Sequence, residues 1–241
     1  MSDTPPADAA RLRVTLVDLD PAPWREIAVP LSMTFKGLHD TIQAAFLWYD
    51  QHLWEFEVAG RRYGMPFDDN FGGERIYKAA AARLTLLRET GNTEFLYVYD
   101  MGDDWQHEIE VLELFTAEPG SRLPRFLGGQ WRTPPEDVGG PPGFEMFLEA
   151  IGDSNHPEHK DLLDWYGDTF DPKDMDEETI KAMMGRLAKA LAFIGSPDDP
   201  VVVALRQAAE TGTDRDIKQA RTLFLKLRPA DRKAALASLI E

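Results

Sequence analysis

The amino-acid sequence predicts an α+β fold followed by an all-helical extension, and three observations support this prediction. Short runs in which apolar and polar residues alternate recur between residues 11 and 114, as in half-buried strands. Apolar residues at helical spacing dominate from residue 144 onward. A Gly-Ser-Pro break at residue 195 precedes the last helical stretches. We therefore expect a disordered N-terminus (1–10), an α+β domain (11–194) and a C-terminal helical extension (195–241).

The first elements after the Pro/Ala/Asp-rich start are expected to be a β-hairpin and a helix. Residues 12–16 alternate with period 2, and residues 24–29 form a second β-like run after the turn at 21–23. Thr34 is a suitable N-cap for the helix that follows. The apolar positions of this helix recur at helical spacing: Phe35, Leu38, Ile42, Ala45 and Phe46. We expect it to pack on the sheet and to expose His39 to solvent on its polar side.

Further β-like runs follow in the middle of the chain. Residues 52–58 alternate, so His52 is expected on the core face of a strand with Trp54, Phe56 and Val58. Residues 95–99 and 108–114 flank an Asp-rich segment, and at the entrance of the second run His107 shares the face of apolar neighbours.

Two segments are expected to be loops. Residues 64–75 are rich in Gly, Asp and Asn, and residues 119–143 hold six prolines with paired glycines. We interpret the second segment as an ordered, irregular loop without regular elements.

Composition restricts the chemistry and the partners. The chain has 241 residues, a net charge of −16 and no cysteine, which excludes disulfides, a thiolate nucleophile and cysteine-ligated metal sites. The excess of acidic residues disfavours non-specific nucleic-acid binding, because phosphate contacts depend on Lys and Arg. The sequence shows neither a secretory leader nor a long apolar run, so we expect a cytoplasmic protein with no membrane partner.

The Asp-rich segment between the two later strands is the first candidate site. Asp100, Asp103, Asp104 and His107 combine hard oxygen ligands with one nitrogen, a set that suits Mg²⁺, Mn²⁺ or Ca²⁺ better than zinc. The alternative is structural, because Asp-Gly and Asp-Asp pairs are favoured turn residues and Trp105 is able to anchor such a turn in the core. Both interpretations remain open at this point.

The second candidate is the loop Pro134-Pro135-Glu136-Asp137-Val138-Gly139-Gly140. Its prolines fix the approach to a carboxylate pair, and its glycines allow a tight turn or a close backbone contact. Glu136 and Asp137 can therefore supply ligands to the first cluster, or the loop can be a rigid lid. His52 and His107 are the histidines best placed to act as ligand or general base.

Taken in order, these segments resemble the plasmid pRiA4b ORF-3-like family, some of whose members are labelled TnpR-like passenger proteins of insertion elements. The resemblance covers about residues 11–187. It implies a compact α+β domain with a mainly antiparallel sheet and packed helices. Many relatives carry cysteine around the Pro-Pro-Glu-Asp motif, where this chain has Thr133 and Val138, so a thiol-dependent or zinc-bound role does not transfer. The matching pieces are 35–46, Trp48 with His52, Leu53 and Phe56, 97–107, 134–140 and 165–172.

Three functions follow as hypotheses. The leading one is a binding or accessory domain, associated with mobile elements, whose pocket recognises a protein, a peptide or a small ligand. The second is a nuclease or phosphohydrolase that depends on Mg²⁺ or Mn²⁺, with the carboxylates and His107 of the two segments as ligands and His107 or His52 as base. The third is a DNA-associated regulator, which the net charge weakens. The candidate pocket residues are His52, Tyr97, Tyr99, Asp100, Asp103, Asp104, Trp105, His107, Glu136, Asp137, Gly139 and Gly140.

Overall fold

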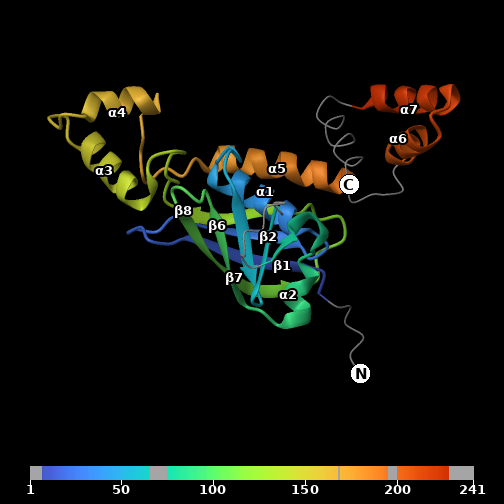
Figure 1. Cartoon of the computed structure of the whole chain (residues 1–241), viewed down its shortest axis with the longest axis horizontal. Helices are drawn as coiled ribbons and strands as arrows, with labels where there is room; N and C mark the ends of the chain where they lie inside the picture. Colours follow the sequence, from blue (N-terminus) through green and yellow to red (C-terminus); the bar gives the residue numbers. More distant parts are fainter. Residues whose placement is uncertain (1–6, 66–74, 168, 195–199, 228–241) are drawn as a thin grey trace. The chain divides into compact units, whose positions relative to one another are not determined.

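The strands form one sheet of eight in the order β5-β4-β3-β6-β7-β1-β2-β8. The computed structural model describes residues 7–65, 75–167, 169–194 and 200–227 (Figure 1). All neighbouring strands are antiparallel except β4 and β5. This confirms the predicted α+β class with a mainly antiparallel sheet. The strands are β1 (Ala9–Leu16), β2 (Trp24–Pro30), β3 (Trp54–Val58), β4 (Arg61–Gly64), β5 (Ile76–Lys78), β6 (Glu94–Tyr99), β7 (Trp105–Phe115) and β8 (Arg125–Gln130).

The helices include one that follows the first hairpin and several in the second half of the chain. They are α1 (Phe35–Phe46), the short 3₁₀ helix η1 (Ala79–Ala81), α2 (Thr85–Thr90), α3 (Gly140–Gly152), α4 (His159–Tyr166), α5 (Glu177–Ile194), α6 (Pro200–Thr211) and α7 (Asp214–Lys226). The chain forms two compact units, Met1–Met184 and Gly185–Glu241, so the boundary falls within α5. None of the described helices is long and apolar enough to cross a membrane.

The predicted first hairpin is present, but it begins earlier than expected. β1 pairs with β2 and also with β7, and its first residues Ala9 and Ala10 are fully buried between Pro30 and Val29 on one side and Phe115 and Leu114 on the other. The end of the segment predicted to be disordered is therefore part of the sheet. Small side chains without polar groups fit this closely paired position at no desolvation cost.

Helix α1 lies across one face of the sheet (Figure 1). Its N-cap Thr34 accepts a hydrogen bond from the Gly37 N–H, as the sequence predicted. Phe35 packs on aromatic rings of three strands, at 5.4 Å from Phe56 and 4.9 Å from Tyr63, and at 6.4 Å from Phe95. The buried face of the helix and the sheet thus form one aromatic core.

The region predicted to be an irregular loop contains an edge strand. β8 pairs with β2 inside residues 119–143 and forms the edge of the sheet on that side. Gly129 is the residue that allows this approach: a Cβ there would lie 2.8 Å from the Trp24 carbonyl oxygen and from Arg25 Cδ. The glycines that suggested a loop instead lie in this edge strand.

Arg25 on β2 fixes the chain that leaves β8. Its side chain is buried, and its five N–H groups all donate, to the carbonyl oxygens of Trp24, Ala45, Gln130 and Trp131 and to the Thr133 hydroxyl. Burial lowers the pKa of Arg25 to about 10, so the guanidinium keeps its charge at neutral pH. The segment that leads to Glu136 is therefore held against β2 and the end of α1.

Candidate metal and ligand site

His52 and three carboxylates converge where three connections meet in the first unit. His52 lies between α1 and β3, Asp100 directly follows β6, and Glu136 and Asp137 lie in the loop before α3. The His52 Nε2 atom is 3.1 Å from Asp137 Oδ1, 3.6 Å from Asp100 Oδ2 and 3.7 Å from Glu136 Oε2. β3 and β6 are neighbours in the sheet, which brings His52 and Asp100 together. We call these four side chains the His52 cluster.

Asp100 is held by its own turn. Its backbone N–H donates to the Leu53 carbonyl oxygen at 2.8 Å, and its Oδ1 accepts from the N–H groups of Gly102 at 2.9 Å and Asp103 at 3.3 Å. This is an Asx turn of the kind the Asp-rich sequence suggested. It leaves Oδ2 directed at His52, so the turn and the site use different oxygens of one carboxylate.

Glu136 is positioned by the segment that follows α1 and by β6. Its Oε1 accepts from the Tyr49 N–H at 2.8 Å and from the Tyr99 hydroxyl at 3.0 Å. Burial raises the pKa of Glu136, and the hydrogen bonds from Tyr49 and Tyr99 oppose this shift. Burial also raises the pKa of Tyr99, which therefore stays protonated and donates. Gln51 completes the arrangement by donating its N–H to the Tyr99 hydroxyl oxygen at 3.1 Å.

The His52 cluster contains three carboxylates and no Lys or Arg that would neutralise their charge. His52 Nε2 is covered by neighbouring atoms but makes no hydrogen bond, although Asp137 Oδ1 is near it. Within the described residues, no Lys or Arg forms an ion pair with Asp100, Glu136 or Asp137. Asp137 is 65% exposed, whereas the side chains of Asp100 and Glu136 are 10% exposed. The three carboxylates thus surround a nitrogen that makes no hydrogen bond, and Asp137 is the member most exposed to solvent.

Other predicted ligands lie outside this cluster. Asp103 Oδ2 accepts from the Gly139 N–H at 3.1 Å, and Asp104 Oδ2 accepts from the Gln106 side chain at 2.9 Å. His107 is fully buried, edge-on to Phe46 at 5.0 Å and Trp48 at 5.3 Å. The expectation that these three side chains join one ligand set is corrected: two of them cap or brace the turn, and His107 belongs to the core.

The remaining candidate residues support the site without facing it. Tyr97 and Trp105 are buried in the aromatic core. Gly139 and Gly140 have left-handed backbone conformations, with φ of 95° and 69°, and Gly140 lies against the Asp103 backbone. The structure thus joins the two predicted segments through Asp103 and the glycines, and it brings Asp100, Glu136 and Asp137 to His52.

A hydrogen-bonded network behind the cluster was not anticipated. His39 is fully buried, not solvent-facing, and is stacked on Trp54 with ring centroids 3.9 Å apart. Its Nε2 donates to Asp50 at 2.7 Å, and its Nδ1 accepts from the Tyr97 hydroxyl at 2.8 Å. Gln43 closes the ring by donating to the Tyr97 hydroxyl oxygen and accepting from the Asp50 N–H.

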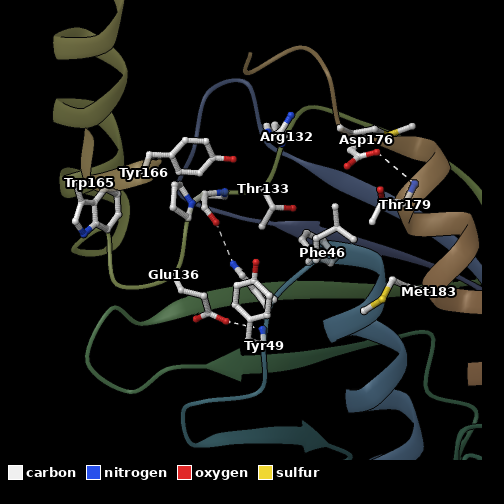
Figure 2. A pocket seen from close by; sticks show the side chains of 15 residues that line it. Phe46, Tyr49, Arg132, Thr133, Glu136, Trp165, Tyr166, Asp176, Thr179 and Met183 are labelled. Carbon is white, nitrogen blue, oxygen red and sulfur yellow. Dashed lines mark hydrogen bonds between the residues drawn. The ribbon is translucent and has the colours of Figure 1, made fainter. Parts of the chain in front are cut away.

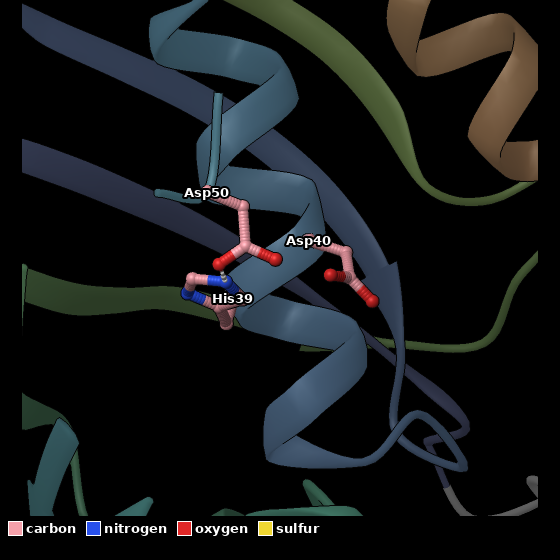
Figure 3. A group of neighbouring side chains, drawn as sticks. All are labelled: His39, Asp40 and Asp50. Atoms are coloured by element: carbon pink, nitrogen blue, oxygen red, sulfur yellow. Dashed lines mark hydrogen bonds and ion pairs between the residues drawn. The ribbon is translucent and has the colours of Figure 1, made fainter. Parts of the chain in front are cut away.

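This network excludes one alternative metal site. His39, Asp40 and Asp50 lie close enough to hold an ion, but both nitrogens of His39 are already hydrogen-bonded. Figure 3 shows the Asp50 carboxylate at the imidazole, with Asp40 directed away from it. A sequence signal existed: His39 and Gln43 are four residues apart and share one helix face. The polar face of α1 is thus buried, and it anchors the segment that carries His52.

Two hollows adjoin the His52 cluster. One of about 510 Å³ is bordered by Tyr49 and Glu136, with Arg132 and Asp176 across from them (Figure 2). Trp165, Tyr166 and Met183 add aromatic and apolar surface to it. The other hollow, of about 470 Å³, includes His52 and Asp100 in its lining. Both sizes suit small ligands or a few residues of a peptide.

Comparisons with known proteins identify relatives of the whole first unit. The model of a family described as plasmid pRiA4b ORF-3-like protein matches residues 8–179. The uncharacterised protein y4hQ of Sinorhizobium fredii is 35% identical over 185 residues, covering 77% of this chain and 91% of the relative. The crystal structure of a protein of unknown function, MM3350 of Methanosarcina mazei Go1, is similar with a TM-score of 0.65 and 34% identity, covering 71% of this chain and 95% of that chain. The family match includes every residue of the His52 cluster.

Proposed function

The chain belongs to the plasmid pRiA4b ORF-3-like family, and for this member we propose the function of a divalent-cation-dependent binding domain. The cation is held by His52, Asp100 and Asp137, with Glu136 as a further oxygen ligand. A small ligand or a short peptide segment binds beside it.

The convergence of three carboxylates on the unused His52 nitrogen carries this proposal. An octahedral ion with ligands at about 2.1 Å holds adjacent ligand atoms roughly 3 Å apart. The separations of 3.1, 3.6 and 3.7 Å from Nε2 are close to that value. One imidazole with several carboxylates suits Mn²⁺ best, because Mg²⁺ prefers oxygen ligands alone and zinc favours more nitrogen or sulfur.

The ligand space lies on the Glu136 side. Glu136 belongs both to the cluster and to the lining of the 510 Å³ hollow. A ligand in this hollow would reach the cation with a polar group and place its apolar part on Trp165 and Met183. Orientation by a few polar groups inside a mainly apolar lining is typical of binding pockets.

The same geometry favours binding over phosphoryl chemistry. Phosphoryl transfer relies on cationic groups that stabilise charge on the transferred group. The cations that line the two hollows are engaged elsewhere, Lys36 by Asp40 and Asp50 and Arg132 by the Asp174 carbonyl oxygen. His107, a predicted base, is buried in the core, and His52 is needed as a ligand. Glu136 is held by Tyr49 and Tyr99. In the proposed complex His52, Asp100 and Asp137 serve as cation ligands and Glu136 is held by hydrogen bonds, so the cluster is assigned no general base.

Calorimetric titration of the metal-stripped chain with Mn²⁺ tests the proposal. We expect binding by the wild type and an affinity lower by on the order of tenfold or more in Asp100→Asn and His52→Gln. Asp104→Asn is the matched control, since Asp104 lies in the same turn and contacts Gln106 instead of the cluster. Equal affinities in all four proteins would refute the site. Metal-dependent turnover of p-nitrophenyl phosphate, lost in Asp100→Asn, would replace the binding function by a hydrolase.

A further inference from the structure

The charge of the C-terminal unit is opposite to that of the whole chain. Residues 185–241 contain ten Lys or Arg and seven Asp or Glu, within a protein whose net charge is −16. The excess of carboxylates therefore belongs entirely to residues 1–184. The negative net charge therefore disfavours binding of polyanions to the first unit, but it does not disfavour their binding to the second.

Three exposed cations of this unit lie along one face of α7, while the exposed Arg221 lies off this face and the exposed Arg186 and Lys189 belong to α5. Arg215, Lys218, Thr222 and Lys226 are three or four residues apart, so they form a stripe along the helix, with Gln219 beside it. All five side chains are exposed, whereas Ala220 on the other side is 3% exposed. A hollow of about 380 Å³ is lined by Arg215, Lys218, Gln219, Thr222 and Leu223.

The stripe is not neutralised within the unit. Among the described residues, no carboxylate forms an ion pair with Arg215, Lys218 or Lys226. The nearby Asp216 lies off the stripe, where its carboxylate accepts from the hydroxyls of Thr211 at 2.6 Å and Thr213 at 2.8 Å. These bonds stabilise the start of α7 and leave the cations available to a partner.

We infer that α7 is a docking surface for double-stranded DNA. Its 13 residues span about 20 Å, and an exposed helix of this size enters the major groove, which is about 12 Å wide. Arg, Lys, Gln and Thr are the side chains that contact phosphates and base edges there. α7 also follows α6 after a short turn containing Gly212, whose φ is +60°, the order found in helix-turn-helix proteins.

Other polyanionic partners fit this surface less well. The major groove of A-form RNA is too narrow for a helix. A membrane-bound helix needs a continuous free apolar face. On α7 the exposed apolar side chains Ile217 and Leu225 are separated by the exposed Arg221, and Ala220 is buried. The inference is independent of the cation site, because every residue of the His52 cluster lies in the first unit.

Fluorescence anisotropy of the full chain with a labelled 20-bp duplex tests this inference. If all three cations contact phosphates, a plot of the logarithm of the association constant against the logarithm of the salt concentration should have a slope of about −3. The variant Arg215→Gln/Lys218→Gln/Lys226→Gln should bind at least tenfold more weakly at low salt and should lose most of this slope. Its circular dichroism spectrum and Mn²⁺ affinity should match those of the wild type.

A second triple variant, which removes the same number of positive charges from the first unit, provides the control. Arg122, Lys160 and Lys173 are exposed cations of the first unit, and their replacement by Gln should leave DNA binding within about twofold of the wild type. An equal loss in both triple variants would show a general charge effect and overturn the inference. Absence of binding at low salt would also overturn it, as would equal binding of double-stranded RNA or polyglutamate.

Discussion

At the residue scale, His107 shows how burial decides the role of a side chain. Its Nδ1 donates to the Trp105 carbonyl oxygen at 3.1 Å, and its Nε2 is buried without a partner. Burial among Phe46, Trp48 and Tyr97 lowers the pKa of His107 to about 3. The imidazole is therefore neutral in the folded protein across the physiological range, which suits a core residue.

This low pKa predicts a loss of stability in acid. The unfolded chain binds a proton near pH 6.5 and the folded chain only near pH 3, so the free energy of unfolding decreases as the pH falls through this window. Between pH 7 and pH 5 the contribution of His107 is about 2 kcal/mol. Urea unfolding at the two pH values should show a smaller loss for His107→Phe than for the wild type, by about this amount. An unchanged pH dependence in the variant would contradict the prediction.

The sequence identified all four residues of the cluster but not which of its other candidates lie outside it. Asp100, Glu136, Asp137 and His52 were all candidates. The alternation of residues 107, 109 and 111 also placed His107 on an apolar face. Which candidate histidine meets the carboxylates depends on the pairing of β3 with β6 and on the course of the chain after β8. These are long-range contacts, and local periodicity carries no information about them.

At the element scale, the Asp-rich turn and the loop before α3 form one unit through a close backbone contact. Gly140 has φ of +69°, and a Cβ there would lie 2.7 Å from the Asp103 carbonyl oxygen. The neighbouring Gly139 N–H donates to Asp103 Oδ2. The position of Asp137 next to His52 therefore depends on Gly140, three residues later, because a side chain there would clash with the Asp103 backbone.

Gly140→Ala should separate these two segments. We expect a loss of about 1–3 kcal/mol in unfolding free energy, because alanine is strained at this φ and its methyl group meets the Asp103 carbonyl oxygen. Mn²⁺ affinity should fall as well, since Asp137 moves with the loop. Gly152→Ala, at the end of the same helix with open space around it, serves as the control in urea unfolding and calorimetry. Wild-type Mn²⁺ affinity in Gly140→Ala would show that the contact does not position Asp137.

Helices and strands with one apolar and one polar face were predicted correctly from the sequence. Features that depend on contacts between residues distant in sequence were missed. The hairpin, α1 and the core face of β3 from Trp54 onward were predicted correctly from alternation and helical spacing. His52, expected on that face, instead precedes the strand and belongs to the cluster. β8 was missed because its paired glycines and the prolines on either side of it suggest a loop, while pairing with β2 determines its conformation. His39 was misplaced because a polar face is usually solvated, and here Tyr97 and Asp50 bury and satisfy it.

At the scale of the whole molecule, the two compact units have different chemistry. The first carries the His52 cluster and the excess of negative charge, and the second carries the exposed cations of α7. A ligand that binds one unit should stabilise that unit, because stabilisation by binding applies to the structure that forms the site.

Hydrogen exchange in the presence of Mn²⁺ should reveal this division. At about 100 times the dissociation constant, the cation adds about 2.7 kcal/mol to the stability of the structure that binds it. We expect slower exchange in α1, β3, β6 and the loop around Glu136, and unchanged exchange in α6 and α7. Equal protection of both units would mean that they unfold together, contrary to this prediction. In the control variant Asp100→Asn, Mn²⁺ should slow exchange in neither unit.

The buried Arg25 has a consequence for the order in which this protein matures. Its five N–H groups join residues 24 and 45 to residues 130, 131 and 133, which are distant in sequence. The course of the chain that carries Glu136 and Asp137 therefore depends on β2, β8 and the end of α1 being assembled around this guanidinium. For the proposed cation site, we expect Mn²⁺ to bind the assembled fold and not to serve as a nucleus from which folding starts.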